Sequence, residues 1–305
     1  MSDFGAWRWY GGEKMADGYF PRGESMLRRV HEEKAVGLFY GQRALCVGAV
    51  KPLNYVGTSR HTRNKSMPFR RISHTGEMFE AVFFGTREEA DRVLEAVRRM
   101  HEQVIGELPE DAGPHYPAGT PYSAVDPELM LWTVAVIADS AEWFYERLVR
   151  RMSDPEREAL WLDYLRFAEL FGMPVQHAPA TYGDFRAWYE RELAAEDLYL
   201  TEEARYMGYA SAFAIPMPNS RRLGKRLHDL VMLCSLPARV RELYGLRCTP
   251  LHEAACAALL ASSRHTRPLL PRRLARGSCV PEFRMVAATE QRRIARGEPT
   301  PQLAD

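Results

Sequence analysis

Apolar residues repeat with helical spacing across residues 86–106, between two polar segments. Thr86 and Glu89 have the spacing of a capping box, so a helix is expected to begin there. One face of this helix collects the positions Ala90, Val93, Leu94, Val97, His101 and Val104. The pattern therefore predicts an amphipathic helix whose buried face carries an imidazole among aliphatic side chains.

The preceding segment, residues 68–85, shows the same periodicity, with polar residues on its apolar face. Pro68 is typical of a first helical turn, and Gly85 of a position just beyond a helix. One side of the expected helix carries Arg71, Thr75, Met78, Phe79 and Val82. A guanidinium and a hydroxyl thus interrupt a stripe that otherwise indicates a core.

Similar start and stop signals predict helices through most of the remaining chain. Asp126 and Pro127 begin a segment that is apolar nearly all round, which indicates a central, fully buried helix. Further helices are expected to start at Ser153, Thr181 and Thr201 and to cover residues 222–236, 237–245 and 249–263.

Convincing period-two strands are missing, which favours an all-α, multi-helix fold with short connections. No low-complexity linker divides the chain, so residues 1–305 are expected to form a single domain. Its proline-rich end, residues 266–305, is expected to be an irregular tail with one short helix near residues 288–297.

Composition narrows the possible partners. The formal net charge is +1 with both signs mixed along the chain, so the basic surface typical of nucleic-acid binding is not expected. The five cysteines are odd in number and never form Cys-x-x-Cys, which argues against a disulfide framework, a zinc ribbon and a covalently attached c-type haem. Buried free thiols are the simpler interpretation.

Membrane and targeting signals are also missing from the sequence. The longest apolar run, residues 129–138, is about half the ~20 residues that a membrane-spanning helix needs. The first residues do not combine a basic segment with an apolar run, as a secretory signal would. The sequence predicts a cytoplasmic protein without a membrane span.

Common catalytic motifs are absent, and the di-iron chemistry of helical bundles is excluded because no histidine has a glutamate three residues before it. What recurs is Arg-x-x-His, as Arg71 with His74 and Arg98 with His101. Three residues apart on a helix can share a face, so each pair could bring a cation and an imidazole to one site.

Simpler interpretations of these residues stay open. His101 could be a core histidine bonded to a neighbour, the arginines could reach solvent, and Thr75 could bond its own backbone. His228 lies near an apolar face and is the rival ligand, whereas the others are expected at the surface or in loops: His31, His61, His115, His177, His252 and His265.

A series of segments in fixed order resembles one family: "FGTREEADRV", "RRMHEQVIG", "GTPYSAVDPELMLW", "ADS", "ELFGMP", "PATYGDFRAWY" and "LPARVRELYGL". This order is similar to that of the haem-dependent oxygenases that include the fungal oxygenase MpaB and the bacterial latex clearing protein, a rubber oxygenase. The resemblance covers about residues 35–285. It implies an all-α domain with a globin-like core that binds haem b.

The resemblance also implies roles for particular residues. His101 matches the proximal iron ligand and Arg98 the cofactor-binding arginine before it, while Arg71 and Thr75 match a distal pair. His74 stands where rubber oxygenases carry a lysine, and would supply a proton or a sixth iron ligand. Dioxygen would be the co-substrate and a small, apolar, unsaturated molecule the substrate.

Two positions depart from the family pattern. Ile105 replaces an arginine of many relatives, and Val134 replaces a histidine of others. Two alternatives to the oxygenase are therefore a haem-binding protein without turnover and a helical protein of the same fold that has lost haem. The sequence does not predict the oligomeric state.

Overall fold

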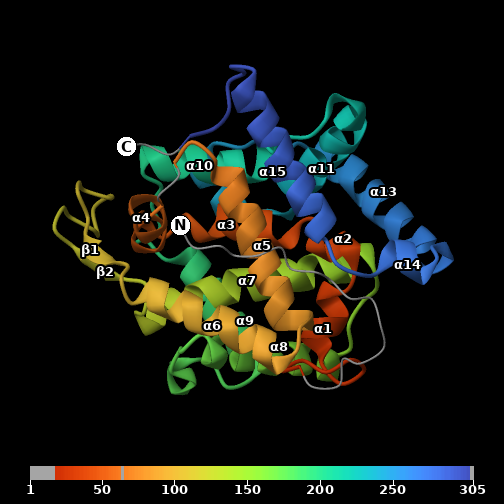
Figure 1. The fold of residues 1–305 in the computed structure, drawn as a ribbon, viewed down its shortest axis with the longest axis horizontal. Coiled ribbons are helices and arrows are strands. Elements are labelled where there is room, and N and C mark those ends of the chain that lie inside the picture. Colours follow the sequence, from red (N-terminus) through yellow and green to blue (C-terminus); the bar gives the residue numbers. More distant parts are fainter. Residues whose placement is uncertain (1–17, 63–64, 303–305) are drawn as a thin grey trace.

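The computed structural model describes residues 18–62 and 65–302, and within them the fold is all-α, as predicted (Figure 1). The prediction that the chain lacks a secretory signal rests on its first residues, which lie outside the described ranges. The α-helices are α1 (Met26–His31), α2 (Lys34–Gly37), α3 (Tyr40–Gly48), α4 (Pro52–Arg60), α5 (Pro68–Phe84), α6 (Arg87–His101), α7 (Pro127–Leu148), α8 (Asp154–Leu170), α9 (Tyr182–Ala194), α10 (Glu202–Phe213), α11 (Arg222–Ser235), α12 (Ala238–Tyr244), α13 (Pro250–Thr266), α14 (Arg272–Ala275) and α15 (Val280–Ala295). Short 3-10 turns are η1 (Val175–His177), η2 (Asn219–Arg221) and η3 (Arg267–Leu269).

The predicted central helix, α7, packs against α2, α3, α8 and α13 (Figure 1). Its side chains from Leu131 to Ala141 are almost all buried, and the Trp132 indole donates a hydrogen bond to the carbonyl of Gly48 on α3 (3.2 Å). The Asp126 carboxylate accepts from the amides of Glu128 and Leu129, so the predicted N-cap is confirmed.

The sequence missed one small antiparallel hairpin, formed by β1 (Ile105–Glu107) and β2 (Pro121–Ser123). Ile105 pairs with Ser123, and Glu107 with Pro121. With three residues each, these strands are too short to show a period-two pattern. The hairpin packs beside α4 through a second small core that contains Val56, Val104 and Tyr122.

Only Gly85 and Thr86 separate helices α5 and α6. The predicted capping box is present: the Thr86 hydroxyl accepts from the Glu89 amide (3.3 Å), and the Glu89 carboxylate accepts from the Thr86 amide (2.9 Å). The two helices also pack against each other.

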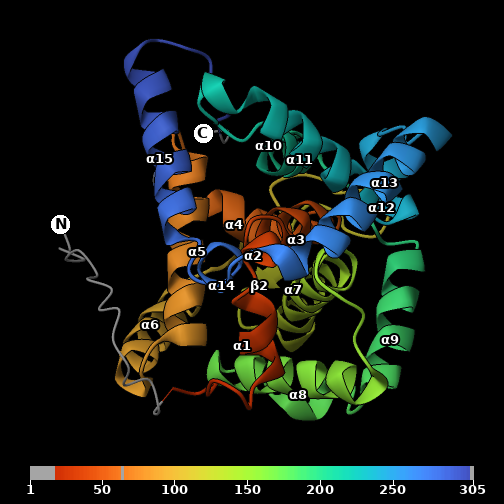
Figure 2. The ribbon, with the colours of Figure 1, turned by 90° about the vertical axis from the view of Figure 1, so that its right-hand side faces the viewer.

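The C-terminal region differs from the irregular tail that the sequence predicted. Helix α15 has 16 residues and packs along α5 (Figure 2). The Ser73 hydroxyl donates to the carbonyl of Phe283 (2.8 Å), and the missing side chain of Gly76 leaves room for the Phe283 ring. The sequence signals underestimated this helix because its stability comes from packing on α5 rather than from its own residues.

None of the helices in residues 18–62 and 65–302 combines the length and the apolar character that crossing a membrane requires.

Candidate functional site

Arg71 lies in the first turn of α5, with its side chain directed back to α4 and the residues after it. Its Nη1 donates to the carbonyl of Thr58 (3.2 Å) and to the hydroxyl of Thr62 (2.5 Å). It forms no ion pair with any carboxylate of the described residues. Burial lowers the pKa of this guanidinium, which shows that its charge is poorly solvated. A partly buried cation without a counter-charge can hold an anionic or electron-rich group.

Thr75 lies one turn further along α5, on the same side as Arg71. Its hydroxyl donates to the carbonyl of Arg71 (3.1 Å), as the simpler sequence interpretation allowed. This bond uses the only proton of the hydroxyl, while the oxygen can still accept.

His101 is the last residue of α6 and is partly buried, so it ends the helix instead of lying in its middle. Its Nδ1 is buried and has no hydrogen-bond partner within the described part of the chain. Burial lowers the pKa of the imidazole and favours the neutral form. A neutral imidazole with an unused ring nitrogen is the form that ligates metals.

The rival ligand, His228, is fully accounted for by its neighbours. Its Nε2 contacts the Gln42 side-chain oxygen (2.7 Å), its Nδ1 contacts the Asp229 carboxylate (3.2 Å), and its ring stacks on Phe39. Both ring nitrogens have partners, which is the arrangement expected of a core histidine.

His31 was predicted in a loop, and this prediction is wrong. It ends α1, is 4% exposed, and its Nε2 contacts the Tyr164 hydroxyl (2.7 Å). Burial lowers its pKa to about 3, so it is a neutral core residue. The sequence carried no signal for this because the rings around it come from distant segments: Tyr40, Phe83 and Tyr164.

In each Arg-x-x-His pair, one residue is partly buried and the other is exposed. Arg71 and His101 are partly buried, but His74 and Arg98 are exposed. Residues three apart on a helix differ by about 60° around its axis, so a face that buries one can leave the other in water. The partly buried candidates on these two helices are therefore Arg71, Thr75 and His101.

The two positions that depart from the family pattern, Ile105 and Val134, both carry apolar side chains. Ile105 belongs to β1 rather than to α6 and is 61% exposed, whereas Val134 is buried in α7. Two shallow hollows on the described surface lie elsewhere, one between α9 and α12 and one along α8 and η1. The candidate site is thus defined by the chemistry of its side chains.

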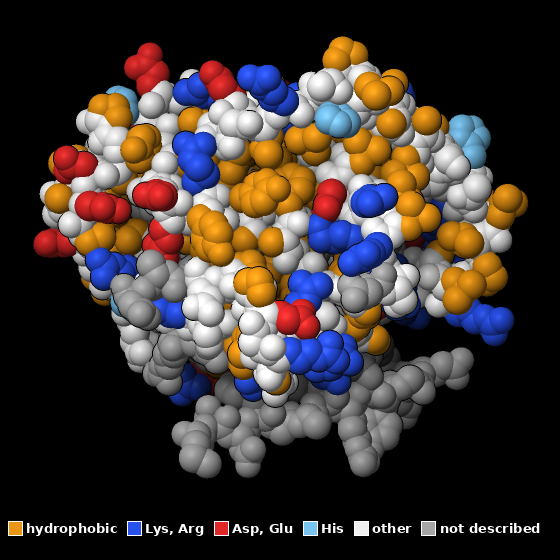
Figure 3. All heavy atoms as spheres, turned by 90° about the horizontal axis from the view of Figure 1, so that it is seen from above, with side chains coloured by type: hydrophobic (Ala, Val, Ile, Leu, Met, Phe, Trp, Pro, Cys, Tyr) orange, Lys and Arg blue, Asp and Glu red, His pale blue; other side chains and the backbone are white. Residues whose placement is uncertain are grey.

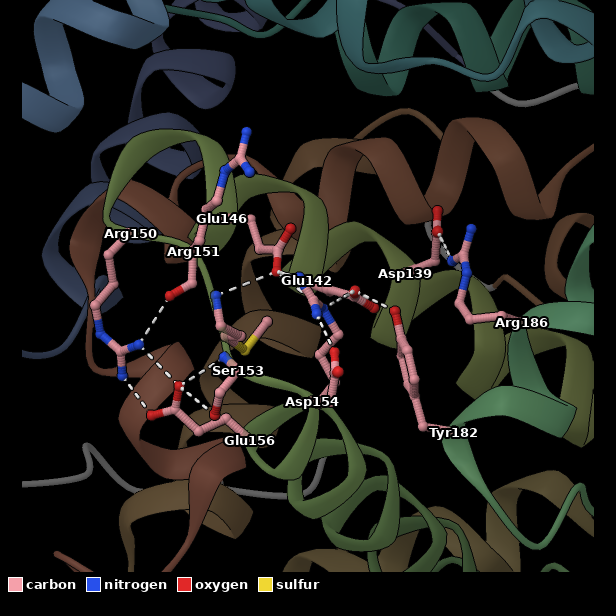
Figure 4. A network of polar contacts seen from close by, with 12 residues as sticks. Asp139, Glu142, Glu146, Arg150, Arg151, Ser153, Asp154, Glu156, Tyr182 and Arg186 are labelled. Atoms are coloured by element: carbon pink, nitrogen blue, oxygen red, sulfur yellow. Dashed lines mark hydrogen bonds and ion pairs between the residues drawn. The ribbon is translucent and has the colours of Figure 1, made fainter.

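A buried polar network joins α7 to its neighbouring helices (Figure 4). Asp139 accepts from Arg43 on α3 (2.7 Å) and from Arg186 on α9 (2.5 Å). Burial alone would raise the pKa of Asp139, but the two arginines lower it. The sequence alone could not identify these arginines as partners of Asp139, because they lie 96 and 47 residues away.

Further ion pairs extend this network towards α8. Arg157 pairs with Glu146 (2.5 Å), Tyr182 donates to Glu142 (2.5 Å), and a bond from Arg150 lowers the pKa of Glu156 to about 2 (Figure 4). Each of these groups has a partner from the protein itself, so the network is structural.

Comparison with curated proteins and with solved structures gives no match. A match does come from the family described as the catalytic domain of the ER-bound oxygenase mpaB/B' and the rubber oxygenase, and it covers residues 28–265. It begins somewhat earlier than the resemblance seen in the sequence, and it ends before α14 and α15. Because this match includes more than half of the 305 residues, the chain belongs to the mpaB and rubber oxygenase catalytic-domain family.

Proposed function

We propose that this chain is a haem b-dependent oxygenase that acts with dioxygen on a small, apolar, unsaturated substrate. Family membership supports the oxygenase class. One observation carries the haem assignment: the Nδ1 of His101 is buried without a hydrogen-bond partner in the described residues, and the imidazole is kept neutral by burial. An unsatisfied buried nitrogen costs free energy unless something binds there.

The residues present fit such a group chemically. His101 would ligate the iron, and the Arg71 guanidinium would hold an anionic group such as a propionate, because it lacks a carboxylate partner among the described residues. When bound, haem iron would supply the activation of dioxygen that amino-acid side chains do not provide.

The other site residues would orient groups and move protons. Thr58 and Thr62 hold the Arg71 side chain in place through its Nη1. The exposed side chain of His74 would deliver protons from the solvent side of α5. Apolar side chains along α5, such as Met78 and Phe79, would exclude water from an apolar substrate.

A visible absorption spectrum of protein produced with ample haem tests this assignment. We expect a Soret band that is lost or strongly changed in His101→Ala and unchanged in His177→Ala, which removes an exposed histidine far along the chain. A colourless wild-type protein would refute the haem assignment. A band that survives in His101→Ala but disappears in His228→Ala would move the ligand to α11.

Oxygen consumption with an apolar alkene tests turnover separately. Arg71→Ala is expected to lower turnover, and Arg71→Lys to restore part of it because the charge returns without the forked geometry. A Soret band without oxygen consumption in the wild type would instead indicate haem binding without turnover.

A further inference from the structure

Three leucines project from the short segment of residues 267–276, which contains η3 and α14 and is called the leucine loop below. Leu269 is 81% exposed, Leu274 61% and Leu270 47%. The loop lies at the right-hand edge of the molecule, where apolar and basic side chains project together (Figures 1 and 3). Single exposed leucines are common, but three within six residues form an apolar tip.

The leucine loop is held firmly at both ends. Arg267 and Arg276 both bond to the carboxylate of Glu33, which is completely buried (2.7 and 2.6 Å). The Gly277 amide donates to the carbonyl of Glu32 (2.8 Å), and Ala275 is buried. The three leucines are therefore exposed although the loop that carries them is held in place at both ends.

The sequence around the leucine loop carries only basic charges. No aspartate or glutamate occurs between Glu253 and Glu282, whereas five arginines do: Arg264, Arg267, Arg272, Arg273 and Arg276. Glu33 pairs with two of them. Arg272 and Arg273 are exposed and make no ion pair within residues 18–62 and 65–302. The loop thus joins exposed leucines to uncompensated positive charge.

We propose that the leucine loop docks the protein on an anionic lipid bilayer, with its leucines in the headgroup and acyl boundary and Arg272 and Arg273 against lipid phosphates. Apolar residues flanked by basic ones are the pattern that binds such surfaces peripherally. A convex tip can enter a bilayer interface, and its charge complements anionic headgroups. This inference does not depend on haem, although an apolar substrate would be concentrated in the same bilayer.

Co-sedimentation with vesicles tests the proposal. The full chain is mixed with vesicles of phosphatidylcholine alone, or with vesicles in which phosphatidylglycerol replaces about a third of the lipid, at low and high salt. We expect binding to the anionic vesicles that weakens as salt screens the arginines. Because each arginine near such a surface strengthens binding about fivefold, Arg272→Gln with Arg273→Gln should weaken it by about 25-fold.

The leucines are tested with a matched control. Leu269→Ser with Leu274→Ser should abolish the binding that remains at high salt. Leu251→Ser should leave it unchanged, since Leu251 is 77% exposed but begins α13, about 22 Å of helix away from Thr266. All these side chains are exposed, so the variants are expected to fold.

Three results would overturn the proposal. The first is a wild-type protein that stays in the supernatant with anionic vesicles, and the second is equal binding by the loop variants and the control. The third is self-association without lipid that the leucine variants remove, which would assign the loop to a second copy of the chain. Each result is independent of the Soret band, so failure here is distinguishable from failure of the haem assignment.

Discussion

The side-chain carboxylate of Glu290 accepts hydrogen bonds from the backbone amides of Phe69 (3.0 Å) and Arg70 (2.8 Å). These amides belong to the first turn of α5, whose amides have no partners inside the helix. Glu290 lies on α15 and is completely buried. A residue beyond the family match therefore caps the helix that carries Arg71 and Thr75.

Replacing Glu290 with alanine should destabilise the protein by about 2 kcal/mol, because two amides of the first turn of α5 lose a charged acceptor. The midpoint of urea unfolding measures this change. Glu298→Ala is the control, since its side chain is 45% exposed and its ion pairs with Arg293 and Arg296 are long. Equal midpoints for both variants would contradict the capping role.

Gly76→Ala should destabilise the contact between α5 and α15. An added Cβ would lie 2.6 Å from the Phe283 ring, which would have to move, at a cost of about 1–3 kcal/mol. Gly224→Ala on α11 meets nothing within 4 Å, so it should stabilise its helix by up to about 1 kcal/mol. Thermal unfolding compares the two, and Phe283→Leu should partly rescue Gly76→Ala; a stabilised Gly76→Ala would refute the close contact.

Asp139→Asn should cost about 3–5 kcal/mol, because it leaves the Arg43 guanidinium buried without its counter-charge. Asparagine has nearly the same shape, so the loss reports the charge and not a cavity. Glu190→Gln is the matched control: it contacts Arg186 at 3.7 Å but is 71% exposed. Denaturant unfolding measures the free energy of unfolding of both variants. Equal values would mean that the charges of Arg43 and Asp139 are solvated in the folded protein.

The buried His31 should make the protein less stable in mild acid. Burial lowers its pKa from 6.5 to about 3, so between these values the unfolded chain binds one more proton than the folded protein. This contribution is fully present above pH 6.5 and is lost as the pH falls towards 3. The expected loss between pH 7 and pH 5 is about 2 kcal/mol.

His31→Gln isolates this effect, because glutamine keeps a polar group near the Tyr164 hydroxyl but does not titrate. Urea unfolding at pH 7 and pH 5 should show a smaller difference for this variant than for the wild type. His177→Gln, at an exposed histidine, should behave as the wild type does. An unchanged pH dependence in His31→Gln would show that other groups cause the loss.

Local signals were predictable from the sequence, and contacts between distant segments were not. The capping box at Thr86, the helix start at Ser153 and the cap at Asp126 need only neighbouring residues, and all three are confirmed. The Glu290 cap joins residues 221 positions apart, and neither of the two sequence segments predicts this contact. Periodicity placed His101 on the inner face of its helix, but it could not show that the helix ends at this residue.

The Glu290 cap also sets an order of events during synthesis. Helix α5 leaves the ribosome long before its cap exists, because 221 residues separate Phe69 from Glu290. At about 5–20 residues per second, the beginning of α5 waits roughly 10–40 s for its last hydrogen-bond acceptor. Throughout that interval the segment that bears Arg71 has an uncapped first turn, so the nascent chain can complete the α5 end of its candidate site only after Glu290 has been synthesised.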